Sequence, residues 1–471
     1  MSLNLGEECD TNRQKGYNMG WTLQFEDGTL VVRGAKLHEL PSEFVWDKRI
    51  EAPRGPGYLY PAVVYKAIGD KIPYVDEARN WEKQLDMTHR VERNARDYQR
   101  EAVQSWLDHQ RRGVVVLPTG SGKSFVAELC MAQTKRSTMI IAPTLDLVGQ
   151  WYDRMRLAFS ADVGILGGGF HDIRDITVST YDSAYLHLPK YGDRFALLIY
   201  DEVHHLPAQA SLDAAKLSMA PFRLGLTATL EREDGRERLL DSILGPVVYR
   251  KQITQLSGNY LADYEVQRIF VELSEEEKQI YDTSRADYIS FLKEKQISMG
   301  GGGWRKFIQL AARSKRGREA FQSYHRSKKI SHGAQSKIDM LERILKKERG
   351  RRTIIFTNDN PTAYAISQRF LLPCITHHSD VKERQHIISS FANGDYTTVV
   401  TSRVLNEGVD IPAAEVGIVL SGTGTVREHV QRLGRILRPA EGKKALMYEL
   451  VSAGTAEQYT SQRRRNHDAY R

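Results

Sequence analysis

Three short apolar runs, each followed directly by a polar motif, constrain the fold of this chain more than any other feature. The runs span residues 113–117, 138–142 and 196–200, and helix-prone stretches lie between them. Continuously apolar strands that alternate with helices are typical of a parallel sheet covered on both faces, with ligands at the carboxyl ends of its strands. The pattern predicts an α/β domain over residues 91–250.

A second set of apolar runs predicts a second α/β domain over residues 346–455. These runs span residues 352–357, 397–401 and 416–420. The intervening residues 251–345 are rich in charge and helix-prone, so we expect a linker and a helical insert there.

Residues 1–90 are expected to form a small mixed N-terminal domain. Residues 21–25 and 29–32 flank an Asp-Gly turn, which is a strand–turn–strand signal. The Pro- and Gly-rich residues 52–57 predict a loop. In the helical insert, the four consecutive glycines at 300–303 cannot sit inside a stable helix and predict a flexible joint.

Composition and length indicate a globular protein with several cores. The chain has 471 residues, of which 41% are hydrophobic and 27% are charged, a balance typical of folded proteins. No apolar run approaches the roughly 20 residues that a membrane-spanning helix needs, and the N-terminus lacks a secretory signal pattern. We expect an intracellular protein without a membrane partner, cytoplasmic if archaeal and not separable from nuclear by sequence. The three isolated cysteines argue against a zinc finger, a disulfide framework or an iron–sulfur cluster.

Basic residues concentrate in one stretch of the chain. Residues 301–352 hold 16 Lys and Arg against four Asp and Glu, whereas the whole chain has a net charge of +8. Solvated helix faces usually alternate charges of both signs, so a one-sided excess favours a polyanionic partner. Residues 456–471 are expected to form a short basic tail.

The motif after the first apolar run reads Leu-Pro-Thr-Gly-Ser-Gly-Lys-Ser and predicts a phosphate cradle. In its turn, Gly120, Ser121 and Gly122 would let backbone N–H groups approach phosphate closely. Lys123 would reach the β- and γ-phosphates, and the Ser124 hydroxyl would join the shell of a Mg²⁺ ion. The usual pattern begins with Gly, where this chain has Leu.

Carboxylates and arginines complete the predicted ATP site. Asp201 and Glu202 follow the third apolar run, as a metal-binding Asp and a water-activating Glu should. Alternatively, Asp201 and Glu202 could only cap the loop that follows them. The predicted phosphate cradle on a neighbouring strand argues against this alternative. Arg435 lies 312 residues beyond Lys123 and shares a helix face with Arg438, so both guanidiniums can stabilise the transferring phosphate. We therefore expect ATP to bind in a cleft between two domains and to drive a motor.

Together these motifs resemble the superfamily-two helicases and, within them, the XPB family of DNA repair and transcription helicases, over residues 93–455. The resemblance implies two RecA-like parallel-sheet motor domains, ATP and Mg²⁺ as cofactors, and 3′→5′ movement on DNA. It also accounts for Leu117 at the start of the cradle motif, because the family's own form of this motif departs from the usual Gly in the same way. The matching motifs are Arg96 to Gln99 for adenine recognition, Asp201 to His204 as the DExH box, Thr227 to Thr229 for coupling hydrolysis to nucleic-acid grip, Asn406 to Asp410 with Gly408 and Asp410 at the nucleotide, and Gln431 to Arg438 with Gln431 among the catalytic residues.

Two features narrow the resemblance to XPB. Arg232, Glu233 and Asp234 reproduce the family's RED motif, which is associated there with strand separation. A charged trio has no wedge chemistry of its own, so that role follows from the resemblance alone. The basic insert takes the place of the family's thumb, and the short N-terminal domain is similar to the damage-recognition module of archaeal members.

Candidate DNA contacts fall into two groups. In the motor domains the resemblance implies Thr144, Thr180, Gly167, Gly168, Thr357 and Thr401, although a Thr at a strand end commonly caps the next helix. In the insert the candidates are Arg305, Lys306, Arg313, Lys315, Arg316 and Arg318. Trp304, Phe307, Ile308 and Ala311 have helical spacing, so we expect an apolar stripe rather than base-stacking platforms.

The leading hypothesis is an ATP-dependent 3′→5′ DNA helicase or translocase that opens duplex DNA in nucleotide excision repair or transcription. Its partners would be single-stranded and forked DNA and a repair nuclease or a transcription and repair factor. Three alternatives remain at this point: a double-strand DNA translocase that does not separate strands, an RNA helicase, and a DNA-binding scaffold that uses ATP as a switch to recruit a partner.

Overall fold

The computed structural model describes residues 20–81, 83–230, 235–256, 260, 263–299, 303–402, 414–421 and 444–464. The chain divides into two compact units, one made of residues 1–118 and 122–251 and the other of residues 252–471 together with residues 119–121. In the part of the chain that the structure describes, no helix is long and apolar enough to cross a membrane.

The first unit begins with a five-stranded mixed sheet in the order β3-β4-β2-β1-β5. Its elements are β1 (Trp21–Glu26), β2 (Thr29–Arg33), the 3₁₀ turns η1 (Leu37–Glu39) and η2 (Gly57–Leu59), β3 (Val45–Asp47), β4 (Ala52–Pro56), α1 (Tyr60–Gly69) and β5 (Tyr74–Asp76). Because side chains alternate along a strand, Trp21 and Leu23 lie on one face, in a core shared with Val63 and Val64 of α1. The predicted strand–turn–strand at 21–32 is confirmed.

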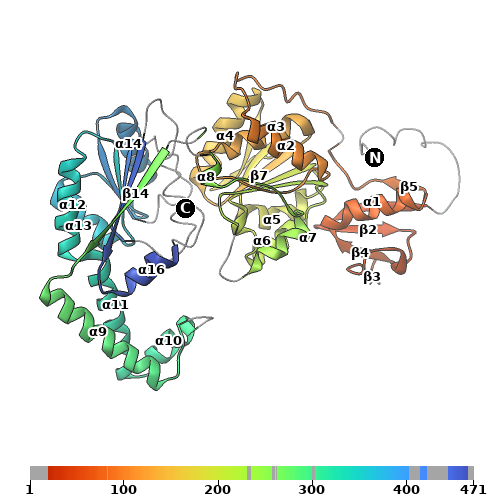
Figure 1. Cartoon of the computed structure of the whole chain (residues 1–471). Coiled ribbons are helices and arrows are strands. Elements are labelled where there is room, and N and C mark those ends of the chain that lie inside the picture. Colours follow the sequence, from red (N-terminus) through yellow and green to blue (C-terminus); the bar gives the residue numbers. More distant parts are fainter. Residues whose placement is uncertain are drawn as a thin grey trace. The chain divides into compact units, whose positions relative to one another are not determined.

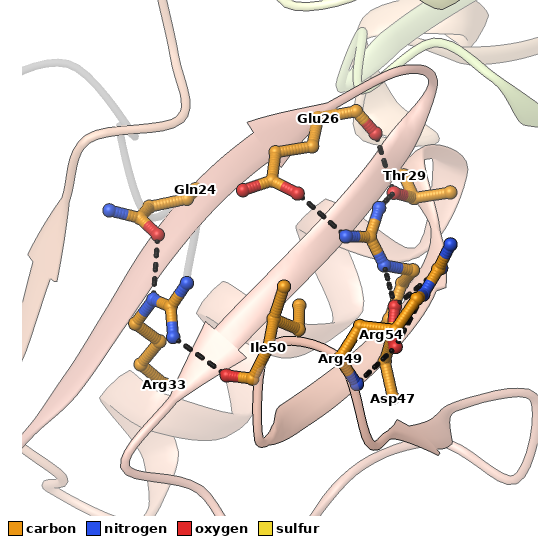
Figure 2. A network of polar contacts seen from close by, with 8 residues as sticks. All are labelled: Gln24, Glu26, Thr29, Arg33, Asp47, Arg49, Ile50 and Arg54. Carbon is orange, nitrogen blue, oxygen red and sulfur yellow. Dashed lines mark hydrogen bonds and ion pairs between the residues drawn. The ribbon is translucent and has the colours of Figure 1, made fainter.

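The opposite face of this sheet carries a polar network that ties four strands together (Figure 2). Arg54 lies at its centre, where its guanidinium is within 2.6 Å of Glu26 Oε2 and 3.0 Å of Asp47 Oδ2 and donates to Thr29 Oγ1 at 2.7 Å. Asp47 also pairs with the exposed Arg49 at 2.8 Å. Hydrogen bonds from Arg49, together with the charges of Arg49 and Arg54, hold the pKa of the Asp47 carboxyl well below its usual range.

The loop prediction for residues 52–57 is wrong, because Ala52–Pro56 form strand β4 between β2 and β3. The φ angle of proline suits an extended backbone, and Pro56 stands at the end of the strand, opposite Thr29. Gly55 is needed for packing: a Cβ at this position would lie 2.6 Å from Cδ2 of Phe44.

The small N-terminal sheet packs directly against the α/β domain that follows it. Its core includes Ala196 and Met219 of that domain, and the Asn80 side chain donates to Asp193. A Cβ on Gly57 would lie 3.2 Å from the carbonyl oxygen of Leu217, so the two backbones approach closely. The first unit therefore has one connected interior.

The α/β domain of the first unit has an eight-stranded sheet in the order β13-β6-β12-β11-β7-β10-β8-β9, parallel except for β9. Helices cover both faces of this sheet (Figure 1). Its strands are β6 (Arg112–Val116), β7 (Thr138–Ala142), β8 (Val163–Gly167), β9 (Phe170–His171), β10 (Ile176–Thr180), β11 (Leu197–Asp201), β12 (Phe222–Thr227) and β13 (Val247–Arg250). Its helices are α2 (Asp97–Asp108), α3 (Lys123–Thr134), α4 (Leu145–Phe159), α5 (Tyr181–Tyr191), η3 (Val203–His205), α6 (Gln209–Lys216), η4 (Arg236–Arg238) and α7 (Leu239–Ile243). The three apolar runs are β6, β7 and β11, as predicted.

The second unit has a six-stranded, wholly parallel sheet in the order β14-β19-β18-β15-β17-β16. Its strands are β14 (Asp263–Val271), β15 (Thr353–Phe356), β16 (Cys374–Ile375), β17 (Thr398–Thr401), β18 (Val416–Val419) and β19 (Lys444–Ser452). Its helices are α8 (Ile253–Leu256), α9 (Glu275–Glu294), α10 (Gly303–Ala312), α11 (Lys315–Gly333), α12 (Gln335–Lys347), α13 (Asn360–Phe370), α14 (Val381–Asn393) and α16 (Ala456–Arg464).

One strand of the second sheet lies in the stretch that the sequence predicts to be helical. Residues 263–271 form β14, which pairs with β19 over nine residues. The helical prediction for 251–345 is wrong over this segment, because β14 is amphipathic and half-exposed and lacks the continuously apolar pattern of the other strands. Residues 456–464 of the predicted basic tail form helix α16.

The helices α9, α10 and α11 form an arm with a core of its own (Figure 1). Phe307 and Ala311 of α10 are buried there against Phe291 and Ala320. Trp304 and Ile308 are about two-fifths exposed. The apolar stripe expected on α10 is therefore confirmed for its central residues and only partly buried at its edges. Glycines 300–302 lie outside the described residues.

Candidate active site

The candidate active site lies where the carboxyl ends of β6, β12 and β11 meet at one edge of the first parallel sheet. The phosphate cradle follows β6, and Asp201 ends β11. The sequence predicts the cradle and the carboxylates on neighbouring strands. This prediction is wrong, because β12 lies between β6 and β11 and pairs with both of them. Thr227 at the end of β12 therefore lies between the cradle and the carboxylates, which makes it part of the site.

The cradle has the backbone conformation that phosphate binding requires. Gly120 and Gly122 have φ angles of 83° and 86°, which glycine adopts without strain. Gly122 is the N-cap of α3, so the positive end of that helix begins at Lys123. Gln99 Nε2 lies 3.5 Å from the Gly122 carbonyl, and a Cβ on Gly122 would lie 2.6 Å from this nitrogen. The predicted adenine-recognition residue thus packs directly on the cradle.

The adenine-recognition segment is held in place by its own backbone. Gln99 is buried, and its Oε1 accepts from the Arg96 backbone N–H at 3.0 Å, which closes the first turn of α2. The Arg96 guanidinium donates to the hydroxyl of Tyr98 at 3.2 Å. Both predicted residues therefore lie on one helix end, next to the phosphate turn.

Asp201 is a buried carboxylate whose orientation is set by Trp151 of α4. The indole Nε1 donates to Asp201 Oδ2 at 2.8 Å, and the Glu202 backbone N–H donates to Oδ1 at 3.0 Å. Burial raises the pKa of Asp201 to about 6, and the Glu202 carboxylate acts in the same direction. The hydrogen bond from Trp151 and the nearby Lys123 ammonium oppose this shift.

Glu202, His204 and Thr227 form a polar chain beside Asp201. Glu202 has a left-handed backbone with φ of 46°, a strained conformation for this residue type. The Thr227 hydroxyl donates to the Thr229 carbonyl at 2.8 Å, so its oxygen accepts from His204 Nδ1, 3.1 Å away. Glu202 Oε2 lies 3.3 Å from the same nitrogen.

The same chain reaches the phosphate cradle through the backbone. The N–H of Leu117, the first residue of the cradle motif, donates to the Thr227 carbonyl at 3.0 Å. A shift of His204 or Thr227 would therefore be felt at the start of the phosphate turn. Through this hydrogen bond, the predicted coupling residues His204 and Thr227 are linked to the phosphate turn.

The residues at this edge fit ATP with Mg²⁺. Within the described residues, the hydroxyls of Thr119 and Thr229 are buried and have no hydrogen-bond partner, although buried polar atoms are normally satisfied. Lys123 and Ser124 are half-buried at the start of α3, and Asp201 offers carboxylate oxygen, which Mg²⁺ prefers. A phosphate and its metal ion would supply the missing partners.

Two contributors to the site carry no signal in the sequence. Trp151 has the spacing of an ordinary apolar helix residue, and only the structure shows its indole N–H at Asp201. Glu128 of α3 is also buried, and its carboxylate lies 2.6 Å from His89 Nε2 and 2.7 Å from Arg154 Nη1. This pair of contacts fixes the phosphate-binding helix against α4 and the preceding connection.

The first domain brings its predicted DNA-contact motifs together at the ends of β7, β8 and β10. The Thr144 and Thr180 hydroxyls accept from backbone N–H groups and cap α4 and α5. This is the role expected if each threonine only caps the helix that follows it. A Cβ on Gly167 would lie 3.3 Å from Thr180 Oγ1, and one on Gly168 would lie 2.9 Å from Leu145. Two helix N-termini and a glycine turn thus lie side by side, an arrangement suited to phosphate.

In the second unit, Thr357 and Thr401 are fully buried, and their hydroxyls donate to backbone carbonyls. On the insert, Arg305, Lys306, Arg313 and Lys315 are exposed. Arg316 instead pairs with Asp287 of α9 at 2.5 Å. The remaining predicted site residues lie outside the described residues; they are Arg232, Glu233, Asp234, Gly408, Asp410, Gln431, Arg435 and Arg438.

Three parts of the chain match known protein families. Residues 23–78 match the xeroderma pigmentosum group B helicase damage recognition domain, residues 92–232 the res subunit of type III restriction enzymes, and residues 336–440 the helicase conserved C-terminal domain. The DNA 3′-5′ translocase XPB2 of Sulfurisphaera tokodaii is 44% identical over 371 residues, which are 79% of this chain and 84% of the relative. This chain belongs to the XPB family.

Two further relatives extend well beyond the region that matches this chain. The DNA 3′-5′ helicase XPB of Mycobacterium tuberculosis is 31% identical over 386 residues, 79% of this chain but 63% of that relative. An Arabidopsis thaliana relative, named as an XPB1 subunit of general transcription and DNA repair factor IIH, is 26% identical over 81% of this chain and 50% of its own length.

Solved structures show the same helicase fold. The Hef helicase domain of Pyrococcus furiosus has a TM-score of 0.52 at 18% identity and covers 78% of this XPB chain and 97% of that domain. Dbp5 of S. cerevisiae, bound to RNA and ADP BeF3, has a TM-score of 0.55 at 13% identity, with 80% and 88% covered. Both α/β domains are thus RecA-like, as the resemblance implies.

Proposed function

We propose that this XPB protein is an ATP-driven 3′→5′ DNA translocase that opens duplex DNA. The observation that carries the proposal is the edge of the first sheet, where the phosphate cradle, Asp201 and the His204–Thr227 chain meet. A buried carboxylate beside a glycine-rich phosphate turn suits Mg²⁺-assisted phosphoryl transfer. Bound ATP with Mg²⁺ would supply the phosphoryl group and the metal that stabilises its charge.

Each residue of this edge then has a role. Ser124 and Asp201 would hold the metal ion, Lys123 would neutralise the phosphates, and Glu202 would orient and activate the attacking water. His204 and Thr227 would link that water-activating carboxylate to the rest of the sheet. Gln431, Arg435 and Arg438 of the second domain would stabilise the charge of the transferring phosphate, and Gly408 and Asp410 would contact the nucleotide.

The proposed DNA contacts rest on two features: the N-termini of α4 and α5, and the basic residues of the insert. The N-termini of α4 and α5 lie near Gly167 and Gly168, and the positive ends of both helices favour one strand's phosphates there. The exposed arginines and lysines of the insert would contact duplex phosphates. The N-terminal domain would recognise damaged DNA, and Arg232 to Asp234 would act in strand separation.

The cellular role is proposed from the relatives' names. The Arabidopsis thaliana relative is a subunit of a transcription and DNA repair factor, which supports a role in nucleotide excision repair or transcription and a protein partner of that kind. DNA, ATP and Mg²⁺ are the proposed ligands.

Unwinding of tailed duplexes tests this function. With Mg²⁺ and ATP, the protein should displace the strand of a 3′-tailed duplex and leave a 5′-tailed duplex of the same sequence intact. Equal activity on both substrates would contradict the polarity. RNA of the same sequence should stimulate ATP hydrolysis less than DNA does.

Translocation on duplex DNA without strand separation is a second candidate, because the Sulfurisphaera tokodaii relative is named a translocase. Displacement of a third strand from a triplex, without release of either duplex strand, would favour this candidate. Strand release from a fork would favour the helicase.

A further inference from the structure

The root of the helical insert is joined to the second sheet by a buried polar network. Lys337, in the first turn of α12, has no exposed side-chain surface. Its ammonium lies 2.5 Å from Glu457 Oε2 of α16 and donates to the Leu420 carbonyl at 2.8 Å. The pair connects three segments that are far apart in sequence, and Leu420 directly follows β18.

Further hydrogen bonds extend this network to α9 and α11 of the insert. Glu457 Oε2 accepts from the Ser452 backbone N–H at 2.9 Å, and Ser452 Oγ donates to the Ser331 carbonyl at 2.8 Å. The Ala456 backbone N–H donates to the hydroxyl of Tyr281 at 2.8 Å. The turn between β19 and α16 is therefore bonded to both long helices of the insert.

The network also reaches the loop after β15. The Asn358 backbone N–H donates to Ser421 Oγ at 2.9 Å, and its side-chain amide lies 3.3 Å from His332 Nδ1. The loops after β15, β18 and β19 are thus bonded to the insert at the carboxyl edge of the sheet, where ligand-binding loops of such sheets lie. The segment after Ser421 contains Arg435 and Arg438 in sequence.

A lysine at position 337 is not expected to stabilise the fold more than an apolar residue would. A cation in the first turn of a helix opposes the helix dipole, and a buried ion pair is often no more stable than apolar residues of similar volume. A buried ion pair does require one geometry, because each charge must keep its partner. The pair therefore fixes the insert relative to the strand ends.

We propose that Lys337 and Glu457 are positioning residues that couple DNA binding by the insert to ATP hydrolysis. This inference rests on the proposed function. Movement of α9 and α11 on DNA would be transmitted through Ser331, Tyr281 and Lys337 to the loops at the carboxyl edge of the second sheet, where such sheets bind their ligands.

The test is the double variant Lys337→Met/Glu457→Gln, which removes both charges together and leaves no unpaired buried ion. The matched control is Lys346→Met/Glu342→Gln, the exposed pair on the same helix. ATP hydrolysis is measured without DNA and over a range of DNA concentrations, together with thermal unfolding.

The double variant should keep basal hydrolysis and the half-maximal DNA concentration within about twofold of wild type. Its maximal DNA stimulation should fall by at least about fivefold, while the control stays at the wild-type value. Tyr281→Phe, which removes only one acceptor, should lower the stimulation in the same direction and serves if the double variant does not fold.

Unchanged maximal stimulation in either variant, or a parallel loss of basal rate, DNA affinity and thermal stability, would overturn the inference and leave a purely structural network. A wild-type protein whose hydrolysis does not respond to DNA would instead refute the proposed function.

Discussion

At the scale of single residues, the chemistry of this site depends on how burial and hydrogen bonds tune Asp201. Desolvation raises the pKa of this carboxyl to about 6, and the Trp151 indole N–H opposes the rise by stabilising the charged form. A proton and Mg²⁺ compete for the same oxygens, so metal binding requires the deprotonated group. Activity should therefore be present above this pKa and be lost as the pH falls through it.

Replacement of Trp151 by Phe tests this tuning. The variant keeps an aromatic ring but loses the N–H donor to Asp201, which should raise the pKa of the carboxyl by about one unit. The acid limb of the pH–rate profile should move to higher pH by the same amount, with the rate at pH 8.5 nearly unchanged. A profile that stays in place would contradict the role of this hydrogen bond.

Thr227→Val tests the polar chain between the carboxylates and the cradle. Valine has the shape of threonine but leaves the buried His204 Nδ1 without its hydroxyl acceptor, at a cost of about 1–3 kcal/mol. We expect DNA-stimulated hydrolysis to fall by about tenfold or more while nucleotide binding is retained. Thr134→Val is the control, because this hydroxyl bonds only within α3, to the Cys130 carbonyl at 2.8 Å. Equal effects of the two changes would contradict a specific role for Thr227.

At the scale of elements, the sequence predicts the central strands well and the edges poorly. Strands such as β6, β11 and β15 are apolar on both faces, so their burial is visible in the sequence alone. The amphipathic β14 and the Pro- and Gly-containing β4 lack that signal, because their strand geometry depends on neighbours that the sequence does not reveal. Trp151 is missed for the same reason, since its partner comes from another element.

Gly55 provides a test of packing in β4. A Cβ at this position would lie 2.6 Å from Cδ2 of Phe44, so Gly55→Ala should destabilise the first unit by about 1–3 kcal/mol. Gly69→Ala at the end of α1 is the matched control, because a Cβ there meets no atom within 4 Å. Chemical denaturation should show a loss for the first variant and no loss for the second. Equal stability of both would show that Phe44 can move aside freely.

At the scale of the whole molecule, the excess of positive charge has a defined place. The N-terminal sheet is part of the first unit's interior, whereas the insert is a helical arm with its own core and an exposed basic surface. Not every basic residue is free for DNA: Arg316 is engaged with Asp287 on the neighbouring helix. Arg305 and Lys306 are exposed on neighbouring positions of α10, so they are candidates for phosphate contacts.

The salt dependence of DNA binding tests these two residues. If both contact duplex phosphates, Arg305→Ala/Lys306→Ala should reduce the slope of log affinity against log salt by about 2. Arg343→Ala/Lys346→Ala removes the same charge from exposed positions of α12 and should leave the slope near the wild-type value. Identical slopes in all three proteins would remove α10 from the DNA-binding surface.

We expect DNA to stimulate ATP hydrolysis at the edge formed by β6, β12 and β11. ATP hydrolysis by wild type and by Lys123→Ala, with and without DNA, tests it most directly. We expect DNA to stimulate the wild type, and we expect the variant to lose about 100-fold or more, because the phosphates would lose the charge of the Lys123 ammonium. Hydrolysis that persists in Lys123→Ala, or that ignores DNA in the wild type, would contradict the account.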